Sequence, residues 1–197
     1  MDAEKSGCCC KQTASINKAS YIEGFNGADI KAVTKVSTEL SSKDFIGALR
    51  VRLGMGRMNY KVEPGLYRTG KPNENSPVLV TANYKLTFDI LRKNLTGINA
   101  WILVLDTNGV NVWCAAGKGT FGTKELVNRI KIAELGKIVK HRTVILPQLG
   151  ATGVAAHEVA NDSGFHVIYG PVRATDIKEF LGNGMKATTK MRTVRFN

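Results

Sequence analysis

The residues that are most able to do chemistry lie in the segment NVWCAAGK, residues 111–118. It places the thiol of Cys114 shortly after an apolar stretch and a sharp Asn108-Gly109 turn. A deprotonated thiol is a soft ligand, which suits a polarisable metal centre. The small residues 115–117 remove side-chain bulk beside the thiol, as is needed where backbone approaches a large flat ligand. Crowding by another chain segment would require the same small residues, and a single free cysteine is often only a small buried hydrophobe.

One cysteine does not make a zinc site, because zinc takes three or four protein ligands. A metal cofactor that brings its own equatorial ligands needs only one ligand from the protein. Cobalt in a corrin ring is such a cofactor. The sequence therefore leaves two interpretations of Cys114, an axial ligand to such a metal and a buried hydrophobe.

The elements that must position this segment follow a regular pattern from Pro77 onward. Short apolar runs alternate with amphipathic stretches, which predicts an α/β fold with a mostly parallel sheet and helices on both faces. We expect strands at 78–80, 101–105, 144–146 and 165–169, and helices at 84–93, 123–135, 154–159 and 176–181. Thr123 is the expected N-cap of its helix, and Gly136 the glycine that ends it. Periodicity does not decide whether residues 113–118 continue a hairpin strand that starts at Val110 or form a helical turn.

Parallel sheets of this kind bind ligands at the carboxyl ends of their strands. The loops expected there are rich in Gly, Ala and Thr, which suits backbone contact with a ligand. The candidate ligand-binding residues are Thr81, Ala82, Asn83, Asn111, Val112, Trp113, Cys114, Ala115, Ala116, Gly117, Lys118, Gln148, Gly150, Gly170, Pro171 and Arg173.

The rest of the chain divides by composition. Residues 1–40 are polar and small and are expected to form a flexible tail that contains Cys8, Cys9 and Cys10. Residues 41–76 are expected to be an irregular arm packed on the α/β domain of residues 77–185, with one helical candidate from Ser42 to Leu53. Residues 186–197 form a basic stretch, expected to be a linker.

Composition excludes several classes of protein. The net charge of +12 raises the possibility of a nucleic-acid partner, but the basic run from Lys124 to Arg142 has little aromatic interleaving and no zinc-finger spacing. A solvated helix face is the simpler interpretation, and no nucleic acid is expected. No run of 18 apolar residues and no signal-peptide core occurs, so the chain as given is expected to be soluble. The last twelve residues carry four basic side chains and no acid, which suits the cytoplasmic face of a membrane.

Three long motifs resemble one known family: PVLVTANYKLTFDILR, NVWCAAGKGTFGTKELVNRI and YGPVRATDI, within residues 77–195. They resemble the soluble corrinoid-binding domain of the mercury-methylating corrinoid protein, a relative of the large subunit of the corrinoid iron-sulfur protein of acetyl-CoA metabolism. The resemblance implies a Rossmann-like domain that binds a cobamide. It also implies a helix at 113–118, with Cys114 as catalytic residue and lower axial ligand of cobalt. His141, His157 and His166 are not expected to be ligands, because none stands in the DxHxxG setting of His-ligated cobalamin proteins.

This resemblance implies a corrinoid-dependent methyltransferase that gives methylmercury from Hg(II). A thiolate opposite the methyl group raises its carbanion character, which an electrophile such as Hg(II) requires. The implied partners are a ferredoxin-like protein with two iron-sulfur clusters as reductant, a methylated folate or a folate-dependent methyltransferase as methyl source, and a membrane domain after residue 197. The alternatives are a methyl carrier of acetyl-CoA or one-carbon metabolism, with a Thr in place of the Cys, and a cobamide-binding module without catalysis.

Overall fold

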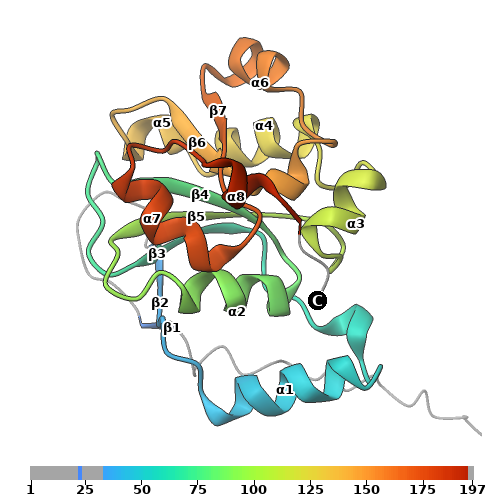
Figure 1. Ribbon diagram of the computed structural model, residues 1–197. Coiled ribbons are helices and arrows are strands. Elements are labelled where there is room, and N and C mark those ends of the chain that lie inside the picture. The colour runs from blue at the N-terminus through green and yellow to red at the C-terminus, as the bar shows by residue number, and fades with distance from the viewer. Residues whose placement is uncertain (1–21, 24–32, 195–197) are drawn as a thin grey trace, which may run out of the picture.

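The computed structural model describes residues 22–23 and 33–194 of the chain (Figure 1). The strands are β1 (Ile22–Glu23), β2 (Thr34–Val36), β3 (Gly65–Thr69), β4 (Val78–Ala82), β5 (Ala100–Leu105), β6 (Thr143–Leu146) and β7 (His166–Tyr169). The α-helices are α1 (Ser42–Arg52), α2 (Lys85–Lys93), α3 (Val112–Gly117), α4 (Thr123–Ile132), α5 (Leu135–Ile138), α6 (Ala156–Ser163), α7 (Ile177–Gly182) and α8 (Thr189–Arg192). Short 3-10 turns cover Arg57–Asn59, Gln148–Gly150 and Ala174–Asp176.

The described strands form one sheet in the order β1-β2-β3-β5-β4-β6-β7. Strands β5, β4, β6 and β7 run parallel to one another, whereas β3 pairs antiparallel with β5. The expected α/β class with a mostly parallel sheet is thereby confirmed. Between β4 and β6 the chain order reverses, because the connection from β5 crosses β4 to reach β6. Such a switch point opens a crevice at the carboxyl ends of the two strands.

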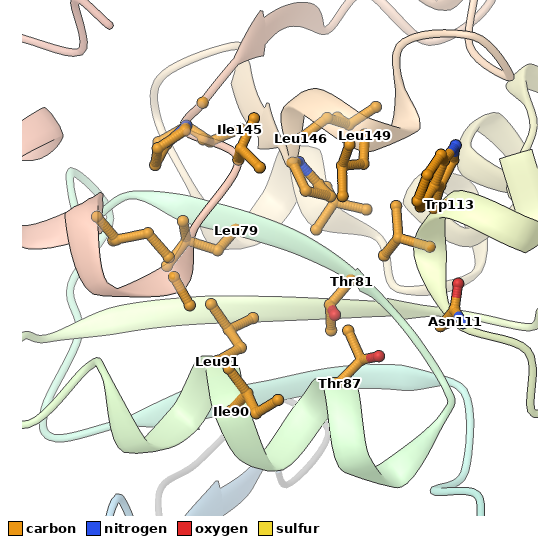
Figure 2. Close-up of a pocket in the computed structure, with 18 residues that line it drawn as sticks. Leu79, Thr81, Thr87, Ile90, Leu91, Asn111, Trp113, Ile145, Leu146 and Leu149 are labelled. Carbon is orange, nitrogen blue, oxygen red and sulfur yellow. The ribbon is translucent and has the colours of Figure 1, made fainter. Parts of the chain in front are cut away.

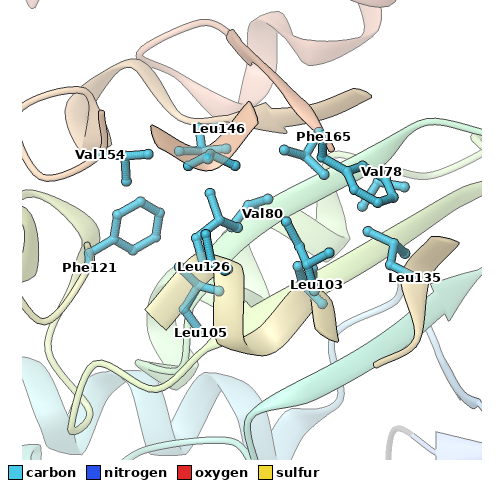
Figure 3. Close-up of a cluster of buried hydrophobic side chains, with 14 of the residues drawn as sticks. Val78, Val80, Leu103, Leu105, Phe121, Leu126, Leu135, Leu146, Val154 and Phe165 are labelled. Atoms are coloured by element: carbon cyan, nitrogen blue, oxygen red, sulfur yellow. The ribbon is translucent and has the colours of Figure 1, made fainter. Parts of the chain in front are cut away.

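Alternation along the central strands divides the hydrophobic core into two layers. On one face, Val78 and Val80 of β4 pack with Leu103 and Leu105 of β5 against α3 to α6 (Figure 3). On the other face, the intervening residues of these strands pack against α2, α7 and α8. Helices therefore cover both faces of the sheet, as the sequence predicts.

The helix predicted from Ser42 to Leu53 is present as α1, but residues 41–76 differ from the predicted irregular arm because they also contain β3. Strand β3 pairs along its whole length with β5, from Gly65 opposite Val104 to Thr69 opposite Ala100. Its sequence GLYRT is short and lacks clear alternation, and glycines at both ends resemble loop punctuation. The side chain of Tyr67 is nevertheless buried and meets Phe88 edge to face, with ring centroids 5.4 Å apart. Long-range pairing, rather than local pattern, makes this segment a strand.

Two predicted helix ends on α4 were wrong. Gly122, not Thr123, is the N-cap of α4, and the Thr123 hydroxyl instead accepts a hydrogen bond of 2.9 Å from the backbone N–H of Ala155. The helix ends at Ile132, and Gly136 lies inside the short helix α5. The break falls at Glu134, whose φ of 48° is left-handed.

A buried ion cluster holds α1 against α2. Asp44 of α1 accepts from Lys85 Nζ at 2.6 Å and from Arg92 Nη2 at 2.9 Å, and both cations also contact Asp89. The formal charges cancel, and Arg92 further donates to the carbonyls of residues 37 and 39. Burial raises the pKa of Asp44, but hydrogen bonds from Lys85 and Ser41 outweigh it and lower that pKa to about 2.

Tyr60 covers this cluster. Burial and the nearby carboxylates of Asp89 and Asp44 raise the pKa of its phenol. Gly47 of α1 lies directly against the ring, since a Cβ there would stand 2.6 Å from the Tyr60 hydroxyl. The inner side of α1 is therefore fixed by charge and close packing.

Part of the stretch predicted as a basic linker packs on the domain. Within residues 186–194, Met191 of α8 is buried in the core layer beside α7, and its carbonyl accepts from the N–H of Val172. No helix among the described residues is long and apolar enough to cross a membrane. Cys8, Cys9 and Cys10 lie outside the described residues.

Candidate functional site

A pocket of about 330 Å³ opens at the switch point between β4 and β6 (Figure 2). Figure 2 shows Thr87, Ile90 and Leu91 of α2 on one side of this pocket and Trp113 and Leu149 on the other. The lining residues are Leu79, Val80, Thr81, Thr87, Ile90, Leu91, Asn111, Val112, Trp113, Ile145, Leu146, Pro147, Leu149, Gly170, Pro171, Val172, Ala174 and Ile177. These residues come from β4, β6, α2, α3 and α7, from the loops after β6 and β7, and from the 3-10 turns at Gln148–Gly150 and Ala174–Asp176.

The pocket surface is chemically simple. Its lining includes no Asp, Glu, Lys, Arg, His or Cys side chain, and its side-chain hydrogen-bonding groups belong to Thr81, Thr87, Asn111 and the indole of Trp113. Such a surface binds an apolar or flat ligand portion with a few directed hydrogen bonds. Acid–base chemistry would require groups from outside this lining.

The thiol of Cys114 stands on α3, whose preceding residues Asn111, Val112 and Trp113 line the pocket, whereas Cys114 itself does not. Asn111 begins the helix as its N-cap, and its side-chain oxygen accepts from the N–H of Cys114 at 3.0 Å. Val112, Ala115 and Ala116 point into the core layer, so Trp113 and Cys114 face outward. Trp113 is 56% exposed although it lines the pocket. The predicted helix at 113–118 is present as α3, and it exposes both an indole and a thiol, about 100° apart around its axis.

Asn83, buried at the end of β4, fixes the loop that leads into α3. Its Oδ1 accepts from the N–H groups of Thr107 at 3.1 Å and Gly109 at 2.9 Å, and its Nδ2 donates to Asp106 Oδ1 at 3.0 Å. The predicted sharp turn is present, with left-handed φ values of 54° at Asn108 and 73° at Gly109. Asn83 is thus a brace beneath the site and has no free polar atom directed at the pocket.

The small residues of α3 serve close packing with another loop. Ala116 packs against Gly153, where a Cβ would stand 3.0 Å from the Ala116 Cα and 2.1 Å from the carbonyl oxygen of Phe121. Gly117 faces open space instead, with nothing near a Cβ built on it. Crowding by a second chain segment accounts for the small side chains of Ala115 and Ala116, which are buried. It does not account for Gly117, which is exposed like Cys114 on the same helix.

The structure divides the sequence-predicted site residues into three groups. The pocket lining brings together Thr81, Asn111, Val112, Trp113, Gly170 and Pro171. Buried in the surrounding packing are Ala82, Asn83, Ala115, Ala116 and Gly150. Outside the lining and at least partly accessible are Cys114, Gly117, Lys118, Gln148 and Arg173, of which Gln148 accepts from Arg192 at 3.0 Å.

Sequence reasoning missed the apolar wall supplied by α2, β6 and α7. Thr87, Ile90 and Leu91 of α2 and Ile177 of α7 belong to helices whose apolar residues resemble ordinary core positions. One signal was available, because Ile90 directly precedes Leu91 and widens the apolar face of α2 toward the pocket. In the structure Ile90 is 47% exposed.

Comparison with known proteins shows the family of this chain. The family model for the CO dehydrogenase/acetyl-CoA synthase delta subunit matches residues 54–181, which include the sheet from β3 to β7 and the whole pocket lining. The chain belongs to this family. The match includes β3, which lies in the segment predicted to be an irregular arm, and stops before α8.

Named relatives are similar to about three fifths of this chain. The acetyl-CoA decarbonylase/synthase complex subunit gamma of Methanopyrus kandleri is 36% identical over 123 residues, which cover 61% of this chain and 26% of that protein. The corrinoid/iron-sulfur protein large subunit of Moorella thermoacetica is 34% identical over 122 residues, 61% of this chain and 27% of that protein. The chain thus spans about a quarter of the length of these relatives.

The resemblance to the corrinoid iron-sulfur branch is confirmed by these matches, whereas the mercury-methylating branch stays a prediction. Among the residues that the structure describes, no three His, Cys, Asp or Glu side chains come together as a metal-binding group. The geometry instead offers one exposed thiol on a helix that lines a largely apolar pocket. That combination fits a cofactor which carries its own equatorial metal ligands and a bulky organic frame.

Proposed function

We propose that this domain binds a cobamide at the switch-point pocket and carries a methyl group on its cobalt. The observation that supports this most is the exposed Cys114 thiol on α3, the helix whose Val112 and Trp113 line an apolar pocket at the carboxyl ends of β4 and β6. The names of the relatives support the same cofactor, since one is a corrinoid/iron-sulfur protein. When bound, the cobamide would supply a nucleophilic cobalt that accepts and releases methyl groups.

Each part of the site has a role in this proposal. The apolar lining holds an organic portion of the cofactor away from water, and Thr81, Thr87 and Asn111 provide hydrogen bonds to its polar fringe. Trp113 covers the cofactor edge with its exposed indole, and Cys114 presents its sulfur to the metal. Asn83 keeps the start of α3 fixed, so that the thiol does not need to be ordered when the cofactor binds.

Filling the pocket tests this binding site. Thr87→Trp adds a large side chain to the lining from α2 and should reduce cobalamin retention in equilibrium dialysis at least tenfold, which corresponds to about 1.4 kcal/mol of binding free energy. Thr96→Trp, at an exposed position after α2, is the matched control and should retain cobalamin like wild type. Equal retention by both variants, with folding confirmed by circular dichroism, would place the cofactor elsewhere.

The methyl acceptor most favoured by the relatives lies in acetyl-CoA metabolism. One of their names refers to an acetyl-CoA decarbonylase/synthase complex, and that protein is about four times longer than the matched region. The domain would then be a methyl carrier serving a larger assembly. Under this proposal, Cys114→Thr should retain methyl transfer, because a Thr is the residue implied at this place in the acetyl-CoA branch.

A second acceptor, Hg(II), is favoured by one specific observation, the exposed thiol of Cys114, at a place where the resemblance implies a threonine in the acetyl-CoA branch. A thiolate donates electron density to the metal and favours transfer of the methyl group to an electrophile. Here Cys114→Thr and Cys114→Ala should both abolish methylmercury formation. Assaying the two variants with the complete protein and its reductant therefore separates the two acceptors.

The partners follow from what the chain lacks in sequence. Its four cysteines include no CxxCxxC run, so iron-sulfur clusters for reducing the cobalt would come from a ferredoxin-like partner. An acidic partner would meet exposed Lys124 and Lys131 of α4, because Arg129 and Lys137 of the same basic run already pair with Glu125 and Glu134. A methylated folate, directly or through a methyltransferase, is the proposed methyl source, and a membrane domain is the further proposed partner of the whole protein.

A further inference from the structure

Helix α1 turns most of its large apolar residues outward and a charged residue inward, which is the reverse of an ordinary surface helix. Its inward side carries Asp44 and Gly47, which contact the buried ion cluster and Tyr60, together with Val51. Its outward side carries large apolar residues. A surface helix of a globular domain normally buries its apolar stripe and exposes its charges.

The outward apolar residues form one continuous stripe. Phe45, Ile46 and Leu49 are each 58% exposed, and Leu53, which directly follows the helix, is 68% exposed. At about 100° per residue these four side chains fall within a sector roughly 100° wide, opposite Asp44 and Val51. Met55 continues the stripe beyond the helix at 50% exposure.

Positive charges border this stripe on both sides. Lys43 and Arg50 lie along one edge and Arg52 along the other, at the positions that 3.6-residue periodicity gives them. The one acid of α1, Asp44, is buried and paired. The exposed surface of the helix therefore combines apolar bulk with cations and carries no anionic side chain of its own.

The position of α1 in the fold suits a flat partner. The helix lies at the lower edge of the view in Figure 1, beyond α2 and apart from α3 to α6. The helix protrudes from the domain and can therefore lie on a flat surface, whereas a protein partner would need a groove that matches the helix. Apolar side chains flanked by Lys and Arg are typical of helices that lie in the interface of an anionic bilayer.

We propose that α1 seats this domain on the surface of an anionic lipid bilayer. Phe45, Ile46, Leu49 and Leu53 would enter the boundary between headgroups and acyl chains, and Lys43, Arg50 and Arg52 would contact lipid phosphates. The ion cluster of Asp44 with Lys85 and Arg92 would transmit the orientation of the helix to α2 and hence to the sheet. This seat is independent of the pocket and of any cofactor.

Vesicle co-sedimentation of the 197-residue chain tests the proposal. We expect binding to vesicles of phosphatidylglycerol and phosphatidylcholine, and at least tenfold weaker binding to phosphatidylcholine alone. Leu49→Gln should weaken binding about tenfold, because a leucine side chain loses roughly its transfer free energy. Ile132→Gln is the matched control, since Ile132 is 57% exposed on α4, far from α1 in the chain.

The charge requirement has its own matched pair. Arg50→Gln with Arg52→Gln should weaken binding to the anionic vesicles several-fold, whereas Lys124→Gln with Lys131→Gln on α4 removes the same charge and should not. Equal binding to neutral and anionic vesicles, or undiminished binding by Leu49→Gln, would overturn the proposal. A wild-type dimer in sedimentation velocity that Leu49→Gln converts to monomer would also overturn it, in favour of a second copy as the occupant of the stripe.

Discussion

Asn83 is the residue whose removal should most clearly reveal how the site is built. It is 1% exposed, and it holds the loop between β5 and α3 through the N–H groups of Thr107 and Gly109 and the carboxylate of Asp106. Asn83→Ala removes all of these hydrogen bonds at once. The two N–H groups would remain in a buried loop without their acceptor.

The expected cost follows from those two donors. An unsatisfied buried donor costs roughly 1–3 kcal/mol, so Asn83→Ala should lower the free energy of unfolding by about 3 kcal/mol. In a domain of this size that loss corresponds to a decrease in Tm of about 6–12 °C. Urea titration followed by circular dichroism measures the free energy, and Asn75→Ala, at an exposed loop position, is the matched control and should change it by less than about 0.5 kcal/mol.

Asn83→Asp adds a test with a distinct pH signature. It keeps an acceptor for Thr107 and Gly109 but places a carboxylate oxygen where Nδ2 stands, 3.0 Å from Oδ1 of the Asp106 carboxylate. Repulsion between the two carboxylates should make this variant less stable at neutral pH, and protonation of one of them at low pH should restore stability. If Asn83→Ala loses less than about 1 kcal/mol, the loop does not depend on this brace and the reasoning is refuted.

Three further outcomes concern the scaffold. Because the pKa of Asp44 is lowered to about 2 in the folded protein, the stabilisation by its carboxylate is complete above about pH 4 and is lost as the pH falls toward 2. The loss amounts to roughly 2 kcal/mol. It should be absent from the acid unfolding curve of Asp44→Asn. Arg92→Met leaves two buried carboxylates with one cation and should lower the free energy of unfolding by about 3–5 kcal/mol in urea titrations; a loss below 1 kcal/mol would contradict the role of the ion cluster. Gly153→Ala forces a Cβ against the Phe121 carbonyl and should cost at least about 2 kcal/mol, whereas Gly117→Ala adds a methyl group to open space and should cost nothing measurable; equal thermal melts of the two variants would show that the loop yields.

The central strands were predictable from sequence because each is buried on both faces. Val78–Val80 and Trp101–Leu105 are continuous apolar runs, and runs of this length between turn signals have few other interpretations. Strand β3 was not predictable in the same way, since its place between β2 and β5 depends on partners far away in the chain. The prediction of the C-terminal end of α4 failed for a local reason. Glu134 adopts a left-handed backbone conformation, which the preferences of this residue type do not anticipate.

The site was predictable only where it depends on loops. Residues that follow the carboxyl ends of β4, β5 and β7 could be placed by the general rule for parallel sheets, and Thr81, Asn111 and Gly170 do line the pocket. The wall from α2 and α7 could not, because Ile90 and Ile177 have the same side chains as core residues. The role of Asn83 was also hidden, since a buried asparagine that braces a loop and one that binds a ligand have the same sequence signature.

The central claim is that Cys114 presents its thiolate to the cobalt of a bound cobamide. Its most direct test is the ultraviolet-visible spectrum of cobalamin reconstituted with wild type and with Cys114→Ala, each after dialysis and with bound cobalt measured. The account predicts that both proteins retain about one cobalamin per chain, because the pocket is unchanged, and that the spectrum of the Ala variant shifts from that of wild type through loss of the sulfur ligand. Identical spectra at equal cobalt content would contradict the claim and leave Cys114 as an exposed thiol beside the pocket.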